Sequence, residues 1–225
     1  MIVVVAAEKG GTGKSTLAVH LAGWSARTGK DVLLVDADRQ GTASIWAEAR
    51  ADLERKAPSV VRQYGRGLRR NVRDLSGRYD EVVVDMGSGD IQGIEALMRV
   101  AHLIVVPVQP NGWDVWTVEL LDDLSADALE VNEDLRVTVV LNRASPHGAS
   151  LDVPAAQDVL RRFEHVEDSG LVVRERAAVR RATPYGMLVD EYVPSDGSAV
   201  RELGEVYRLA YGMSPAESVE IKEAG

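Results

Sequence analysis

The chain contains no cysteine among its 225 residues, which excludes disulfide bonds, thiolate catalysis and iron–sulfur clusters held by cysteine. It also lacks a long apolar run, since none approaches the roughly 18 residues that a membrane-spanning helix needs. The stretch after Met1, IVVVAA, has no basic flank and is too short for the apolar core of a signal peptide. We therefore expect a cytoplasmic protein in a reducing compartment.

An excess of positive charge is lacking too. Lys and Arg number 26 against 35 Asp and Glu, which gives a formal net charge of -9. This balance excludes a protein whose whole surface binds polyanions, so a nucleic-acid site would have to be a local patch. Low-complexity tracts and fixed-period repeats are absent. We expect one domain over residues 1–225, with a polar C-terminal tail from about 213 to 225.

Short, nearly unbroken apolar runs recur along the chain, as is typical of strands buried on both faces of a parallel sheet. These runs occupy residues 2–7, 31–38, 81–88, 102–110 and 135–142, with a weaker one at 58–64. Helical patterns lie between or after them, at residues 15–28, 42–55, 66–76, 91–100, 114–131, 153–163 and 199–211. The alternation predicts an α/β fold with a doubly wound, mostly parallel sheet flanked by helices.

A glycine-rich segment joins the first expected strand to the first expected helix. Its core, GTGKST, has the composition of a phosphate-binding loop, in which backbone N–H groups and the helix N-terminus face the phosphates. In such a loop Lys14 bridges the terminal phosphates and Ser15 reaches Mg²⁺. The other residues expected to bind the nucleotide here are Gly10, Gly11, Thr12, Gly13 and Thr16. A second lysine, Lys9, precedes the core and is not needed to cradle one phosphate chain.

Polar residues end several of the apolar runs, and ligands of parallel sheets bind beyond the carboxyl ends of the strands. Asp36 and Asp38 lie two residues apart and point the same way if the strand persists. Asp85 ends the next strand, as an aspartate that holds Mg²⁺ through water would. One of the pair Asp36 and Asp38 could instead cap the following helix.

Two groups of arginines stand out against the acidic background. The first comprises Arg62, Arg66, Arg69, Arg70, Arg73 and Arg78, with Asp74 as the one acidic residue of residues 62–78. The second comprises Arg174, Arg176, Arg180 and Arg181, with Glu175. Each group either binds DNA phosphates without sequence specificity or forms a solvated face paired with acidic neighbours.

The loop sequence KGGTGKST resembles the deviant Walker A motif of the ParA/MinD group of P-loop ATPases, whose hallmark is the early lysine. In that family this lysine reaches across a nucleotide-sandwich dimer to the phosphates of the other subunit. The resemblance therefore implies that Lys14 serves its own ATP and Lys9 that of its partner. A cation supplied in trans suits phosphoryl transfer, which depends on positioning and on neutralising charge.

The same resemblance implies further roles. The family motif D-x-D-P-Q corresponds to DADRQ here, with Arg39 in place of proline. It assigns Asp38 to the attacking water and Asp36 to the outer shell of Mg²⁺. Three residues, Asn142, Arg143 and Pro194, would flank the adenine. The sequence LNRAS lacks the aspartate of a guanine-reading motif, so ATP is favoured over GTP.

The second arginine group resembles the region that ParA proteins use for nonspecific DNA, in the pattern R-x-x-V-R-x-A-x-x-x-G. Arg176 and Arg180 occupy the matching positions, and Arg174 and Arg181 lie beside them. We therefore expect these four arginines to contact DNA. No such resemblance supports the first group.

The resemblance extends to about Tyr211 and is strongest to the small plasmid type of ParA, which lacks an N-terminal helix-turn-helix. It implies an ATP-dependent DNA partition switch, in which ATP and Mg²⁺ close a homodimer on nucleoid DNA and a ParB-like partner stimulates hydrolysis. A relative that positions another cargo, such as a microcompartment or a chemotaxis cluster, would share every motif. A MinD-like membrane ATPase is disfavoured, because the C-terminal GMSPAESVEIKEAG has few bulky apolar residues and no basic face.

Overall fold

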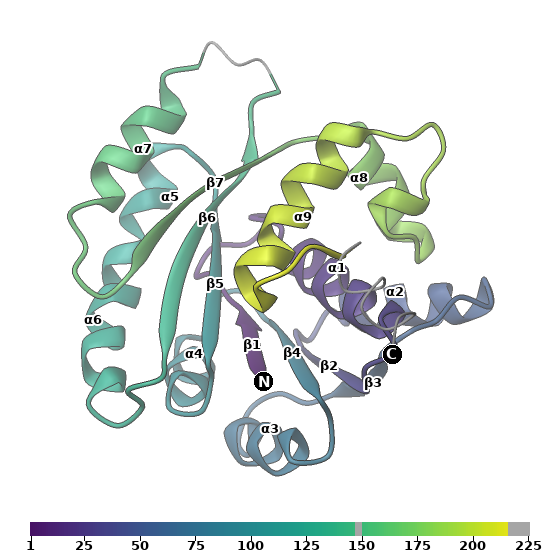
Figure 1. Ribbon diagram of the computed structural model, residues 1–225. Coiled ribbons are helices and arrows are strands. Elements are labelled where there is room, and N and C mark those ends of the chain that lie inside the picture. Colours follow the sequence, from purple (N-terminus) through teal and green to yellow (C-terminus); the bar gives the residue numbers. More distant parts are fainter. Residues whose placement is uncertain (147–149, 216–225) are drawn as a thin grey trace.

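A computed structural model describes residues 1–146 and 150–215 (Figure 1). Its centre is a seven-stranded sheet in the order β3-β2-β4-β1-β5-β6-β7, and all neighbouring strands are parallel. The strands are β1 (Ile2–Val5), β2 (Val32–Ala37), β3 (Ser59–Arg62), β4 (Glu81–Met86), β5 (Leu103–Val108), β6 (Arg136–Ala144) and β7 (Glu167–Arg174). Every residue of β1, β2, β4 and β5 is buried. The predicted α/β fold with a parallel sheet is confirmed.

Helices cover both faces of this sheet. They are α1 (Lys14–Arg27), α2 (Thr42–Asp52), α3 (Leu68–Ser76), α4 (Ile91–Met98), α5 (Gly112–Trp116), α6 (Val118–Leu129), α7 (Asp152–Leu160), α8 (Ala177–Ala182) and α9 (Gly197–Tyr211). Short 3₁₀ turns, η1 (Thr183–Tyr185) and η2 (Val189–Glu191), connect α8 to α9. The helix predicted over residues 114–131 is divided at Thr117, whose N–H bonds to the carbonyl of Asp114 three residues back, which tightens the turn.

Strand β7 was missed by the sequence prediction. Its sequence, EDSGLVVR, begins with polar residues and includes Gly170 at a positive φ of 71°. It lies at the edge of the sheet beside β6, and only one of its residues is buried. An edge strand does not need apolar residues on both faces, so it leaves no continuous apolar run in the sequence.

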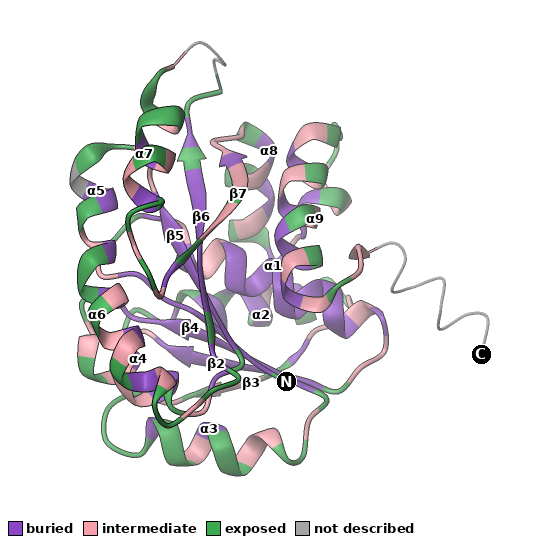
Figure 2. Ribbon diagram, turned by 60° about the vertical axis from the view of Figure 1, so that its left-hand side comes forward, coloured by how far each residue is buried: buried purple, intermediate pink, exposed green. Residues whose placement is uncertain are grey.

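Two hydrophobic cores lie on opposite faces of the sheet. Helices α3 to α7 bury one of them, with Val72, Leu97 and Leu121 among its members. Helices α1, α2, α8 and α9 bury the other, around Trp24 and Tyr207. Figure 2 shows the central strands buried throughout and the outer faces of the helices exposed. Within the described part of the chain, no helix is both long enough and apolar enough to cross a membrane.

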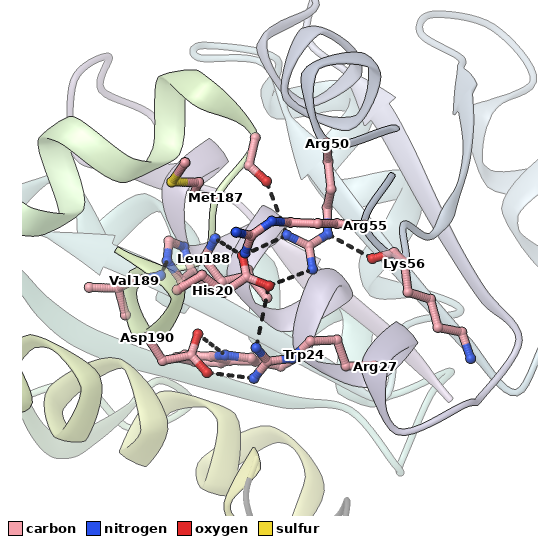
Figure 3. Close-up of polar contacts among 12 residues, drawn as sticks. His20, Trp24, Arg27, Arg50, Arg55, Lys56, Met187, Leu188, Val189 and Asp190 are labelled. Atoms are coloured by element: carbon pink, nitrogen blue, oxygen red, sulfur yellow. Dashed lines mark hydrogen bonds and ion pairs between the residues drawn. The ribbon is translucent and has the colours of Figure 1, made fainter. Parts of the chain in front are cut away.

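A buried ionic cluster joins α1, α2 and η2 (Figure 3). Arg50 is fully buried and donates two hydrogen bonds to the Glu191 carboxylate, at 2.8 and 3.0 Å, and one each to the carbonyls of Gly186 and Lys56. Burial raises the pKa of Glu191, but the hydrogen bonds from Arg50 and Leu188 and the charges of Arg50 and Arg55 lower it to about 2. This Arg50–Glu191 cluster therefore stays ionised at neutral pH.

His20 connects the same region to the first turn of α1. One ring nitrogen of His20 bonds to the Thr16 carbonyl at 2.7 Å, and the other accepts the N–H of Val189 at 3.1 Å. Burial lowers the pKa of His20 to about 4. The neutral His20 ring thus connects the first turn of α1 to η2.

Candidate functional site

The predicted phosphate-binding loop connects β1 to α1. Gly13 adopts φ 95° at the N-terminus of α1, and a Cβ atom there would lie 2.2 Å from Nδ2 of Asn142. Asn142 donates to the Thr12 carbonyl at 2.6 Å, and Arg143 donates to the Gly11 carbonyl at 2.6 Å. Within residues 1–146 and 150–215, no side chain caps α1, which leaves its first N–H groups available to an anion. The end of β6 therefore holds the loop through the Asn142 and Arg143 side chains.

Lys14 is buried within this loop. Its ammonium donates to the carbonyl of Lys9 at 2.8 Å and to Oγ of Ser88 at 2.7 Å. Burial lowers the pKa of Lys14, while the carboxylates of Asp85 and Asp38 oppose that change. Lys14 is thus held among the groups expected to surround the terminal phosphates.

Lys9 points to a different partner. Its ammonium lies 2.5 Å from Oδ1 of Asp114, in helix α5, and its side chain is 40% exposed. Asp114 is held in turn, because its N–H bonds to the side chain of Asn111, which caps α5. The structure therefore separates the two lysines, with Lys14 inside the loop and Lys9 bound to another element of its own chain.

Asp85 has the features expected of a carboxylate that faces a metal ion. It is fully buried at the end of β4, and neither oxygen has a hydrogen-bond partner within residues 1–146 and 150–215. Burial raises the pKa of Asp85 to about 7, and the Asp36 and Asp38 carboxylates add to this rise, whereas Ser15 and Lys14 oppose it.

These residues fit Mg²⁺, which protein sites commonly bind through one or two carboxylates together with substrate phosphates and water. Ser15 and Asp85 would hold the ion beside the loop. No group of three or more His, Asp or Glu residues in the described ranges could hold a metal by itself. A protein-only metal centre is therefore not what these residues form.

The two aspartates after β2 have different contacts. Asp36 is fully buried, and its carboxylate accepts hydrogen bonds from the N–H and hydroxyl of Ser44 at 2.8 and 2.7 Å. This is the helix-capping role that the sequence left open for one of the pair, so Asp85 rather than Asp36 has free oxygens. Asp38 is partly exposed, and a Cβ atom at Gly87 would come within 3.4 Å of its Cα. The segment after β4 therefore lies next to Asp38.

A cavity of about 420 Å³ lies beside the loop. Its walls include Gly13, Ser15 and Thr16 from the loop, Asn142 and Arg143 from the end of β6, and Val179 and Leu203 from the opposite side. Such a cavity, next to the phosphate site, is where a nucleoside would lie. Pro194, expected to flank the adenine, is exposed and is not among the residues that line it.

The second arginine group lies beside the same cavity, and its members differ in exposure, since the Arg176 side chain is 23% and the Arg180 side chain 65% exposed. Arg174, Arg176 and Arg180 line it. Glu202 accepts from Arg176 at 2.5 Å and from Arg174 at 3.4 Å, and Glu175 lies 3.0 Å from Arg180. Arg181, the fourth arginine, is exposed. The DNA contact predicted for these residues stays a prediction, and three of them already have carboxylate partners.

Three functional neighbours escaped the sequence prediction, namely Ser88, Asp114 and Glu202. Each contacts a partner that is distant in the sequence. The separation is 74 residues for Ser88 with Lys14, 105 for Asp114 with Lys9 and 26 for Glu202 with Arg176. No spacing in the sequence marks such pairs. The motif NGWD, with Asn111 as a helix cap, was the one local signal that Asp114 sits in a fixed position.

The loop, the buried Asp85 and the adjoining cavity agree with a match to a known family. Residues 3–189 match CbiA, described as the CobQ/CobB/MinD/ParA nucleotide binding domain. The chain belongs to this family. The predicted relation to ParA and MinD is confirmed, and with it a nucleotide-binding domain.

Two curated relatives of this family member are named "Maintenance of carboxysome distribution protein A". The relative from Gloeobacter kilaueensis is 32% identical over 209 residues, which cover 92% of this chain and 90% of the relative. The relative from Halothiobacillus neapolitanus is 28% identical over 204 residues, or 90% and 92% of the two chains. A solved ATP complex of a McdA variant from Cyanothece has a TM-score of 0.72 at 17% identity and covers 95% of this chain and 96% of that one. The likeness to this structure shows the shared fold.

Proposed function

We propose that the protein is an ATP hydrolase that positions a large intracellular cargo. The observation that carries this proposal is the separation of the two lysines, because Lys9 is directed to Asp114 and not to the loop that Lys14 occupies. Near full-length similarity to two proteins named for carboxysome distribution supports positioning as the task.

In the proposed cycle, Lys14, Ser15 and the loop backbone bind ATP, and Asp38 positions the attacking water. Lys9 of each protomer leaves Asp114 and contacts the nucleotide of its partner, so that ATP closes a homodimer. Ser15 and Asp85 would hold Mg²⁺, which when bound neutralises charge on the β- and γ-phosphates. Water and lysine then act on a phosphate chain that two protomers enclose.

The ATP-bound dimer would bind DNA without sequence preference, so the protein would be cytoplasmic and associate with the nucleoid. A ParB-like adaptor on the cargo would stimulate hydrolysis and release the dimer from DNA. Plasmid partition is the second candidate, because the Lys9-bearing loop is the feature by which the sequence resembles partition ATPases. The two functions differ in the adaptor and the cargo.

The dimer step can be tested by light scattering with ATP and Mg²⁺. Asp38→Ala should slow hydrolysis and accumulate a particle of twice the 24.4 kDa chain mass. Lys14→Ala, which removes the ammonium expected on the protein's own ATP, should stay monomeric and serves as the control. Monomers alone in the Asp38→Ala protein would contradict the proposed cycle.

A further inference from the structure

Six arginines surround helix α3, and we call them the α3 basic surface. They are Arg62, Arg66, Arg69, Arg70, Arg73 and Arg78, and all of them are exposed. Residues 62–78 hold one acidic residue, Asp74, so the segment carries a formal charge of 6 − 1 = +5. The chain as a whole carries -9, which leaves −9 − 5 = −14 for the rest. Positive charge is therefore concentrated at this surface.

Packing directs these side chains outward. Leu68 and Val72, one turn apart in α3, are 2% and 1% exposed and belong to the core beneath the helix. Arg69, Arg70 and Arg73 occupy the opposite side, which Figure 2 shows as exposed. In Figure 1, α3 lies at the foot of the molecule, well away from α8. Helix α3 is thus remote from α8, while Arg62 lies beside Arg39 and Gly41 just before α2.

The α3 arginines have almost no acidic partners. Arg70 and Asp74 lie 3.6 Å apart with side chains 80% and 57% exposed, a pair that contributes little in water. Arg62 donates to the carbonyl of Arg39, which carries no charge. Arg66, Arg69, Arg73 and Arg78 form no ion pair with any residue of the described ranges. This differs from the second arginine group, three of whose members bind Glu175 or Glu202.

We propose that the α3 basic surface contacts the phosphate backbone of double-stranded DNA. The guanidinium fork matches two phosphate oxygens, and arginine gives up its water more readily than lysine. Arg69 and Arg73 are one helical turn apart, and their positions differ by about 6 Å along the helix axis. The phosphates of one DNA strand rise by about 3.4 Å per step along the duplex, so two steps cover a similar length. Contacts to phosphate carry no base information, so binding is independent of sequence.

This inference rests on the proposed function, which requires an ATP-bound dimer on DNA. Such a dimer carries two copies of the surface, and two weak contacts on one particle reinforce each other through effective concentration. An exposed segment with five net positive charges, residues 62–78, can then retain an acidic protein on DNA. Because the proposed dimer forms only with ATP, its binding to DNA would also depend on ATP.

A bilayer is a poorer match for the surface than DNA. An amphipathic helix binds a bilayer by inserting its apolar face, and the apolar residues of α3 are already engaged, since Leu68 and Val72 lie in the core and the partly buried Leu75 packs against it. The one large apolar side chain exposed in residues 62–78 is Tyr64, at 42%. Electrostatic attraction to lipid would therefore lack the insertion that makes it stable.

The decisive variant combines Arg66→Ala, Arg69→Ala and Arg73→Ala. Its binding to a labelled random-sequence duplex is measured by fluorescence anisotropy with ATP and Mg²⁺ over a series of salt concentrations. We expect affinity to fall at least about 10-fold and the slope of log affinity against log salt to decrease by about 2 to 3. A matched control, Arg161→Ala with Arg162→Ala and Arg201→Ala, removes equal charge at other exposed positions and should bind within about 3-fold of the parent.

A second variant tests for loss of folding. Replacing Arg66, Arg69 and Arg73 with lysine keeps the charge, so most of the affinity should remain, and light scattering should still detect ATP-dependent dimers in both variants. Alanine substitutions that leave DNA affinity unchanged, in a parent that binds DNA, would overturn this inference and leave the proposed function intact.

Two other outcomes would also overturn it. A parent protein that dimerises with ATP yet binds no DNA at low salt would refute both this inference and the DNA step of the proposed function. Flotation with phosphatidylserine vesicles, or competition by poly-glutamate as strong per charge as that by DNA, would assign the surface to lipid or to acidic protein instead.

Discussion

Residues 8–11 and residues 12–16 of the phosphate-binding loop adjoin in sequence but differ in burial and in partners. In the first part, Gly10 and Gly11 are exposed, and Lys9 binds Asp114 in α5. In the second part, Thr12 and Lys14 are buried, and the Lys14 ammonium bonds to the Lys9 carbonyl and to the hydroxyl of Ser88, which follows β4. The second part is thus enclosed, and the first is exposed and paired with another element.

In the proposed dimer, this difference would let one loop serve two nucleotides. An ion pair with a lysine 40% exposed contributes about 1 kcal/mol or less, so Lys9 can leave Asp114 at small cost. Lys14 has no comparable freedom, because its ammonium is enclosed and already hydrogen-bonded. The buried part is suited to binding, and the exposed part to a change of partner.

The largest effect should separate the two lysines. Lys9→Ala should keep ATP affinity within about 3-fold but lower DNA- or adaptor-stimulated turnover by about 100-fold or more, because it removes a cation from the transferred phosphate. Lys14→Ala, the matched variant at the buried part, should weaken ATP binding itself by about 100-fold. Calorimetry of ATP binding and single-turnover phosphate release measure the two quantities. Parental turnover in Lys9→Ala would show that this lysine takes no part in the reaction.

A second effect should come from Asp85, the buried carboxylate whose charge acts on Lys14. The pKa of Asp85 is raised to about 7, so the folded chain holds a proton that the unfolded chain releases near 3.8. Stability is then greatest below the unfolded pKa and is lost as the pH rises through about 7. The full pKa shift corresponds to about 4 kcal/mol of unfolding free energy. Asp85→Asn should recover about 2 kcal/mol of it at pH 8 in nucleotide-free protein, because the amide carries no charge but is still a buried polar group.

Thermal unfolding at pH 5 and pH 8 measures this change. Asp85→Asn should gain stability relative to the parent between pH 5 and pH 8, because the opposite contribution of His20, whose pKa is lowered to about 4, is the same in both proteins. The variant should also no longer respond to Mg²⁺ in ATP binding. Asp127→Asn, at an exposed position of α6, is the control and should behave as the parent does. A steeper loss in Asp85→Asn than in the parent would contradict the proposed cost of the buried carboxylate.

The smallest effect should come from releasing Lys9. Asp114→Asn removes the charge that competes with the partner's phosphates, yet it keeps the backbone bond to the Asn111 cap. We expect ATP-driven dimerisation to tighten by about 3- to 5-fold in analytical ultracentrifugation. Glu119→Gln, an exposed acidic residue of α6, should have no effect. Weaker dimerisation in Asp114→Asn would mean that Asp114 itself supports the dimer.

Local signals were sufficient for most of the fold. Continuous apolar runs predicted the buried strands, and Gly13 before Lys14 predicted the turn into α1, because both depend on neighbouring residues. Strand β7 escaped, since an edge strand keeps polar residues and Gly170. The break at Thr117 escaped as well, because it depends on a hydrogen bond within three residues and not on a proline or glycine.

The site was less predictable because its important pairs are distant in sequence. The role of Lys9 followed from a motif, but its partner Asp114 lies 105 residues away. Arg176 resembled a DNA contact, yet Glu202 on α9 occupies its guanidinium. Residue type alone could not distinguish Asp36 from Asp85, because both are fully buried and the difference lies in Ser44, whose N–H and hydroxyl bond to Asp36 alone.

The Arg50–Glu191 cluster sets a limit on how the chain can be shortened. The family match ends at residue 189, two residues before the carboxylate that neutralises Arg50. A chain ending at that boundary would leave a guanidinium at 0% exposure with no counter-charge from Glu191, at a cost of about 3 to 5 kcal/mol. That is a large share of the stability of an ordinary domain. The segment after residue 189 is therefore needed for stable folding of the nucleotide-binding domain. A chain truncated before residue 191 is not expected to fold on its own.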